Sequence, residues 1–144
     1  MGDVEALVQE LVRLSSGEIE LGPPASEAVL DRTESIVGAL PSDLRAVLQA
    51  VNGLACRRFR LLSALDEARP KATWESIERG QAAVFDADDD LGRRFLCIAD
   101  IGDGFALYDR EEAVVWFLEG DEREVRRTDM NLIELISVAV ARTE

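Results

Sequence analysis

The chain has 144 residues, with 29 Asp and Glu against 16 Lys and Arg, no His, and a net charge of −13 at pH 7. A chain of this length fits one domain, residues 1–144, and its acidity disfavours nucleic acid as a partner because phosphate binding needs a cationic surface. Cys56 and Cys97 lack the spacing of a disulfide framework. An acidic start and the lack of an apolar run near the ~20 residues of a membrane helix predict a cytoplasmic protein without membrane contact.

Helices are predicted for the first third of the chain, because apolar residues recur there at every third or fourth position. They cover residues 3–17, 26–38 and 42–53. Ser26 is the expected N-cap of the second helix and Gly38 its end. Ser42 or Asp43 is expected to cap the third helix.

The middle of the chain gives weaker signals. Residues 58–62 predict a short strand, and residues 64–69 and 73–83 predict helices. Four aspartates between positions 86 and 90 then predict a solvated acidic loop that leads into the next strands.

Residues 95–118 have the pattern of a three-strand meander, because aromatic and β-branched runs alternate with Asp- and Gly-containing turns. Gly102 and Gly104 predict a hairpin turn, since glycine supplies the positive φ that tight turns require. The last run, residues 114–118, does not alternate, so we expect it to be covered on both faces.

The remaining elements complete a fold class. A further strand runs through Val125, and Thr128 or Asp129 is expected to cap a C-terminal helix that ends near Ala141. The predicted fold is therefore α+β, a mostly antiparallel sheet with a central meander, helices at the N-terminal side, and a C-terminal helix packed on it.

The acidic loop also allows two chemical interpretations. Asp86, Asp88 and Asp90 alternate as in a calcium loop, but the glycine and the bidentate glutamate that such a loop needs are both missing. The same stretch resembles the Asp-x-Asp signature of haloacid-dehalogenase-type phosphatases, whose lysine follows the motif, whereas Lys71 precedes it here. With histidine absent as a general base, we expect no catalytic residue, no metal, no cofactor and no small-molecule substrate.

Short motifs follow one another in a characteristic order. The first group is a helix with Glu27 and Glu34, then Leu40-Pro41-Ser42-Asp43, a hydrophobic helix and Asn52-Gly53. The second group is Phe95–Asp100, Gly102-Asp103-Gly104, Leu107-Tyr108-Asp109, Val114-Val115-Trp116, and a final helix with Leu132 and Leu135. Over residues 19–140 this order resembles the SUKH superfamily, the Smi/Knr-like group of bacterial immunity proteins and fungal cell-wall regulators. Residues 54–94 carry none of its signatures.

The resemblance implies a bacterial protein that binds and neutralises a polymorphic toxin, often a nuclease, and is not an enzyme. The composition fits independently, because an acidic surface attracts and steers a basic protein partner. We hypothesise that carboxylates in the loops of the second half form or rim that surface. They are Asp86, Asp88, Asp89, Asp90, Asp103, Glu119, Asp121 and Glu122.

Two alternatives stay open from the sequence. A regulatory or scaffolding module with an endogenous protein partner would show the same motifs. A metal-assisted phosphoryl enzyme built on Asp86 and Asp88 would instead bind magnesium and hydrolyse a phosphate ester.

Overall fold

The computed structural model describes residues 2–14, 19–56, 58–64, 76–85, 91–119 and 124–143. The helices of this part are α1 (Gly2–Leu14), α2 (Glu27–Val37), α3 (Ser42–Ala50), α5 (Ile77–Val84), α6 (Leu91–Arg94) and α7 (Leu132–Thr143). The strands are β1 (Glu20–Leu21), β2 (Leu54–Cys56), β3 (Phe59–Leu61), β4 (Phe95–Asp100), β5 (Gly104–Asp109), β6 (Val115–Glu119) and β7 (Glu124–Arg127). None of these helices has both the length and the apolar character needed to cross a membrane.

The strands form one sheet in which the spatial order is the chain order, β1 to β7, with every neighbouring pair antiparallel. The predicted meander is β4, β5 and β6. Its first turn is the predicted hairpin, because Gly102 has φ +96° and its N–H donates to Asp100 Oδ1 at 2.8 Å. The predicted α+β class with a mostly antiparallel sheet is therefore confirmed.

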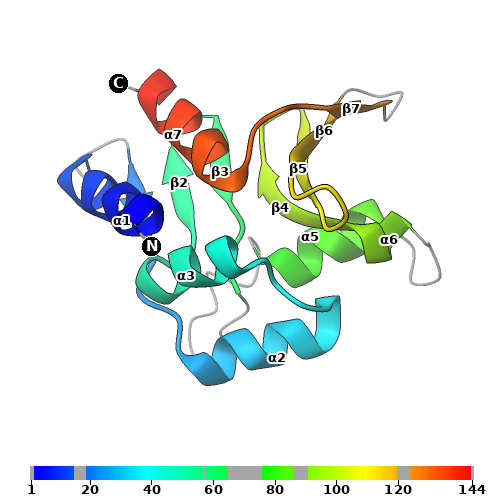
Figure 1. Ribbon diagram of the computed structural model, residues 1–144, viewed down its shortest axis with the longest axis horizontal. Helices are drawn as coiled ribbons and strands as arrows, with labels where there is room; N and C mark the ends of the chain where they lie inside the picture. Colours follow the sequence, from blue (N-terminus) through cyan, green and yellow to red (C-terminus); the bar gives the residue numbers. More distant parts are fainter. Residues whose placement is uncertain are drawn as a thin grey trace.

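Different helices cover the two faces of the sheet (Figure 1). Cys97, Leu107 and Trp116 are cross-strand partners on the face against which α5 packs, since Gly80 of α5 lies next to the Cys97 side chain. Ala106 and Phe117 point to the opposite face, which is turned toward α7. Because α1 and α3 both contact α7, the N-terminal and C-terminal helices close the core on that side.

The strand that is covered on both faces is β4, not the predicted run at residues 114–118. All residues from Phe95 to Ala99 are buried. In β6 only Val115 and Leu118 are buried, while Trp116 and Phe117 are half-buried. The prediction for β6 was wrong because only β7 lies beyond it in the sheet, so β6 is one strand from the edge.

Helix ends follow the prediction for α2. The Ser26 side chain accepts a hydrogen bond from the N–H of Val29 at 3.2 Å, and Gly38 ends the helix with φ +92°. For α3 the prediction was wrong: Pro41 occupies the N-cap position without a side-chain hydrogen bond. The reason is that Pro41 fixes an extended backbone at the end of the α2–α3 loop, so the helix begins directly after it.

The C-terminal helix also has a cap other than the predicted one. Asn131 Oδ1 accepts from the N–H of Glu134 at 2.8 Å, and Glu134 Oε1 accepts from the N–H of Asn131 at 3.3 Å, which is a reciprocal capping arrangement. Thr128 is not the cap because its hydroxyl donates to the Val115 carbonyl at 2.6 Å and so ties the chain to β6.

The middle of the chain agrees in part. The predicted strand at residues 58–62 is β3, whereas β1, β2 and α6 were not predicted. Within the predicted helix at 73–83, the helix begins at Ile77 because the Ser76 side chain accepts from the N–H of Arg79 at 3.2 Å. The helix predicted at 64–69 and the acidic loop at 86–90 lie outside the described residues, except for Ala64.

Candidate partner-binding surface

Arg45 on α3 fixes the corner between α2 and α3. It donates to Glu27 at 2.6 Å, to Asp31 at 2.9 Å, and to Glu34. Hydrogen bonds to Glu27 and Asp31 raise its pKa above the ordinary value. Glu34 also accepts from the N–H of Leu40 at 2.9 Å, so this carboxylate holds the start of the Leu-Pro motif in place.

Asn52 fixes a second point of the fold. Its side chain is buried and pairs with both backbone groups of Ala64: Oδ1 accepts from N–H at 2.8 Å and Nδ2 donates to C=O at 3.2 Å. Gly53 follows with φ +100°, a conformation that disfavours other residues. The Asn-Gly motif therefore clamps α3 to the chain that leaves β3.

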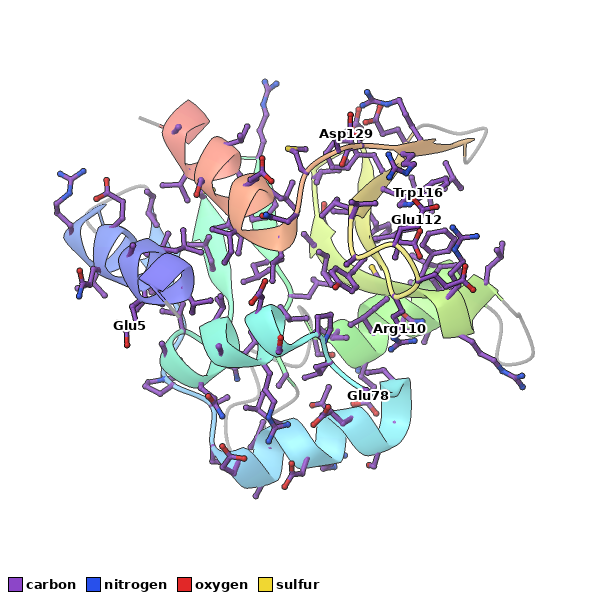
Figure 2. The ribbon with its side chains drawn as sticks, in the orientation of Figure 1. Glu5, Glu78, Arg110, Glu112, Trp116 and Asp129 are labelled. Carbon is purple, nitrogen blue, oxygen red and sulfur yellow. The ribbon has the colours of Figure 1, made fainter. Side chains whose placement is uncertain are left out.

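Asp109, at the end of β5, has no exposed surface. It accepts from Arg94 at 2.9 and 3.2 Å, from the backbone N–H groups of Glu111 and Glu112, and from the indole N–H of Trp116 at 3.1 Å. Burial alone would raise the pKa of Asp109, but the Arg94 guanidinium and the two amides outweigh burial and hold the pKa below its ordinary value. Figure 2 shows Trp116 and Glu112 together at this end of the sheet.

Glu34, Asn52 and Asp109 each tie one part of the chain to another, and we call them the three anchors. They belong to the motifs that carry the family resemblance, and their polar side-chain atoms form hydrogen bonds within the protein. Two further observations on the described residues concern chemical reactivity. Burial raises the pKa of the Cys97 thiol to about 12, so it stays protonated. No group of three or more Cys, Asp or Glu in the described ranges is placed to hold a metal ion.

A groove of about 820 Å³ lies between α7 and the sheet, where residues of β3, β6 and β7 line it. Its apolar lining includes Phe117 of β6 and Leu135 and Val138 of α7, and Val138 is 40% exposed. Its charged lining consists of Arg58, Asp103, Glu119, Arg126 and Arg127. The groove thus offers an apolar floor with charges of both signs, which is the composition of a protein-binding surface.

Two of the predicted partner-binding residues, Asp103 and Glu119, line this groove. Asp103 is exposed, whereas Glu119 accepts from Arg126 at 3.0 Å, and the Arg126 guanidinium lies 5.4 Å from the centre of the Phe117 ring. The other predicted residues lie outside the described residues: Asp86, Asp88, Asp89, Asp90, Asp121 and Glu122.

Sequence reasoning missed the apolar and basic part of the groove. The C-terminal helix that contains Leu135 and Val138 was predicted to pack on the sheet, but periodicity gives the inward face of a helix and not the strand that it faces. Arg126 was assigned to a strand without a role. A signal for it was available, because Arg126 follows Val125 in a short strand near a chain reversal, a pattern typical of a protected sheet edge.

A second hollow lies between α2, α5 and α6. Arg110 spans it, donating to the carbonyls of Val37 at 2.6 Å and Arg93 at 2.8 Å, and burial lowers its pKa. Its Nε and one oxygen of Glu78 are buried without a hydrogen-bond partner in the structure. Arg110 and Glu78, both labelled in Figure 2, line this same hollow. Since Arg110 braces two helices, we assign it a structural role.

No curated protein matches the chain. A family match extends over residues 24–137, which include the three anchors and the groove residues from Arg58 to Leu135. The resemblance seen in the motifs is thereby confirmed, and the chain belongs to the SMI1 / KNR4 family (SUKH-1).

Proposed function

We propose that this protein is an immunity protein that binds and neutralises a basic polymorphic toxin, with a nuclease as the toxin class that its charge favours. Membership of the SUKH-1 family is consistent with an immunity role in general. The observation that carries the more specific proposal is the distribution of charge: residues 85–124 hold 13 acidic and four basic side chains.

Contacts among the described residues add to this argument. Arg94 already pairs with Asp109, Glu111 and Glu112. Arg127 pairs with Glu112 at 2.7 Å and with Asp129 at 2.8 Å. These ion pairs leave the net charge unchanged, so the acidic excess of this half of the molecule still acts on a partner. A nuclease presents a cationic surface to phosphates, so such an excess would speed its association.

The proposed contact surface comprises the groove and the acidic loops beside it in the sequence. Asp103 and Glu119 would take part from the groove, and the six loop carboxylates at positions 86, 88, 89, 90, 121 and 122 would extend the surface. Phe117 and Val138 would supply its apolar centre, since charged rims around apolar contacts are the usual arrangement of protein interfaces.

The test is binding to the product of the gene adjacent to this one, measured by pull-down and then by titration at low and high salt. We expect tight binding that weakens as salt rises and that abolishes the toxicity of the partner. Absence of binding to either neighbouring product would overturn the proposal and favour the regulatory module with an endogenous partner.

Charge-reversal variants locate the contact. The double variant D103K/E119K and the triple variant D88K/D89K/D90K should both slow association. The matched control is E5K/E20K, which changes net charge as much as D103K/E119K. Glu5 lies on α1 (Figure 2) and Glu20 on β1, at the opposite edge of the sheet from β7, and neither residue lines the groove. Equal loss of affinity in the control and in D103K/E119K would show that only net charge matters, and would remove the groove from the contact.

A further inference from the structure

We infer that the partner docks by adding an extended, basic segment to the free edge of β7, so that the seven-stranded sheet continues into the bound protein. This inference rests on the proposed function, because the segment is taken to belong to the toxin. Among the described residues, β7 is the last strand of the sheet and no described strand pairs with its outer side. The strand at the other edge, β1, has two residues and offers far less to pair with.

The hydrogen-bond pattern determines which backbone groups of β7 face outward. The N–H of Thr128 donates to the carbonyl of Val115 at 3.0 Å, and the register pairs Phe117 with Arg126. Because an antiparallel ladder alternates, Arg126 then points its N–H and C=O toward β6. The N–H and C=O groups of Val125 and Arg127 point away from the sheet, and they are the groups that an added strand would bind.

The side chains beside this edge suit an added strand. Phe117 and Arg126 share the groove face, so alternate side chains of an added strand would enter the groove toward Val138. Val125, 44% exposed, points to the opposite face and would meet the remaining side chains. Apolar contacts are thus available on both sides of the edge.

The charge of the residues around β7 indicates which kind of segment would bind there. Residues 119–129 hold five acidic and three basic side chains, and both arginines at the end of β7 already have carboxylate partners: Arg126 has Glu119, and Arg127 has Glu112 and Asp129. A segment carrying Lys or Arg between apolar residues is therefore complementary to this edge. A second copy of the chain would instead bring the same net charge of −13, so its approach is opposed by electrostatic repulsion.

The test is the variant Val125→Pro, with Val125→Thr as the matched control. Proline removes the outward N–H without breaking the β6–β7 ladder, whereas threonine keeps both the N–H and the branched side chain. We expect Val125→Pro to weaken binding of the adjacent gene product by roughly thirtyfold or more, since a partner carbonyl loses its donor and the ring blocks close approach. Val125→Thr should bind within about twofold of the wild type.

Amide hydrogen exchange on the wild-type complex tests the inference even if Val125→Pro fails to fold. We expect the amides of Val125 and Arg127 to exchange at least roughly tenfold more slowly when the partner is bound. Unchanged exchange at these amides, or wild-type affinity in a folded Val125→Pro, would overturn strand addition while leaving the proposed function intact. Failure of the wild type to bind would overturn both. A free protein that dimerises, and dissociates on Val125→Pro, would assign the edge to a second copy instead.

Discussion

The three anchors and the groove differ in what their polar atoms bind. At Glu34, Asn52 and Asp109, side-chain oxygens meet backbone N–H groups, and at each anchor an element is tied to another part of the chain. In the groove, Glu119 and Arg126 bind each other, and Asp103 is exposed. The motifs by which the family is recognised thus report how the chain folds, whereas partner choice is expected on a surface that carries no motif.

The largest effect should come from Asp109→Ala. The substitution leaves a half-buried guanidinium, two amides and an indole N–H without their shared acceptor. We expect the free energy of unfolding to fall by about 3–5 kcal/mol, the usual result of breaking a buried pair from one side. Urea unfolding measures this, and a loss below about 1 kcal/mol would contradict the role of Asp109 as an anchor.

Asp109 should also affect the pH dependence of stability. Its pKa in the folded protein lies below the ordinary value of 3.8. The carboxylate therefore stabilises the fold fully above that ordinary value, and this contribution is lost as pH falls through the lower, folded-state pKa. Asp109→Asn removes the titrating group, so its stability should decline less steeply than that of the wild type below pH 4 in acid unfolding curves.

Asn52→Ala tests the second anchor and should lower the free energy of unfolding somewhat less than Asp109→Ala. The N–H and C=O of Ala64 would lose their partners in a buried environment, which predicts a loss of about 2–3 kcal/mol. The control is Gln49→Ala, which removes an amide that binds Glu27 on the exposed side of α3. That control should stay within about 0.5 kcal/mol of the wild type, and equal losses in both variants would remove the distinction between buried and exposed amides.

Gly80→Ala probes the packing of α5 on the sheet. An added Cβ would lie 2.6 Å from Leu62 Cδ1 and 3.1 Å from Cys97 Sγ, and both residues are buried. Overpacking should outweigh the gain in helix propensity and cost about 1–2 kcal/mol. In a Leu62→Ala background the same substitution should cost less, because the contacted atom is gone; a double-mutant cycle measures the difference. Additive losses would contradict the close contact.

A feature could be predicted from the sequence when it depends on residues that are close together in the chain. The meander, the Ser26 cap and the Gly38 end depend on neighbouring residues, so local patterns were sufficient for them. The caps of α3 and α7 were misplaced because Thr128 and Pro41 have roles set by the adjoining strand and loop. The pairing of β1 with β2 and the packing of α7 against β2 depend on residues far apart in the chain, which periodicity does not encode.

The same dependence on sequence separation explains which residues of the candidate site could be predicted. Asp103 and Glu119 could be identified because charge is visible in composition, and the hairpin that carries Asp103 was predicted. Phe117 and Val138 could not be assigned to one surface, since one was expected to be core and the other was one position on a helix. A groove between two distant elements becomes visible only once the packing of α7 against the sheet is known.

The smallest effect on stability should come from Asp103→Ala, and it sharpens the comparison between anchors and groove. Asp103 is exposed at a hairpin turn that is held by the Gly102 N–H and Asp100, so removing its carboxylate should change the free energy of unfolding by less than about 0.5 kcal/mol. If the groove binds a basic partner, the same variant should slow association several-fold at low salt and much less at high salt, because rim charges act mainly through long-range attraction. Stopped-flow association measures both salt conditions, with Glu5→Ala on α1 as the control of equal charge. A loss of stability as large as that of Asn52→Ala would place Asp103 among the anchors, and salt-independent association would exclude it from the contact.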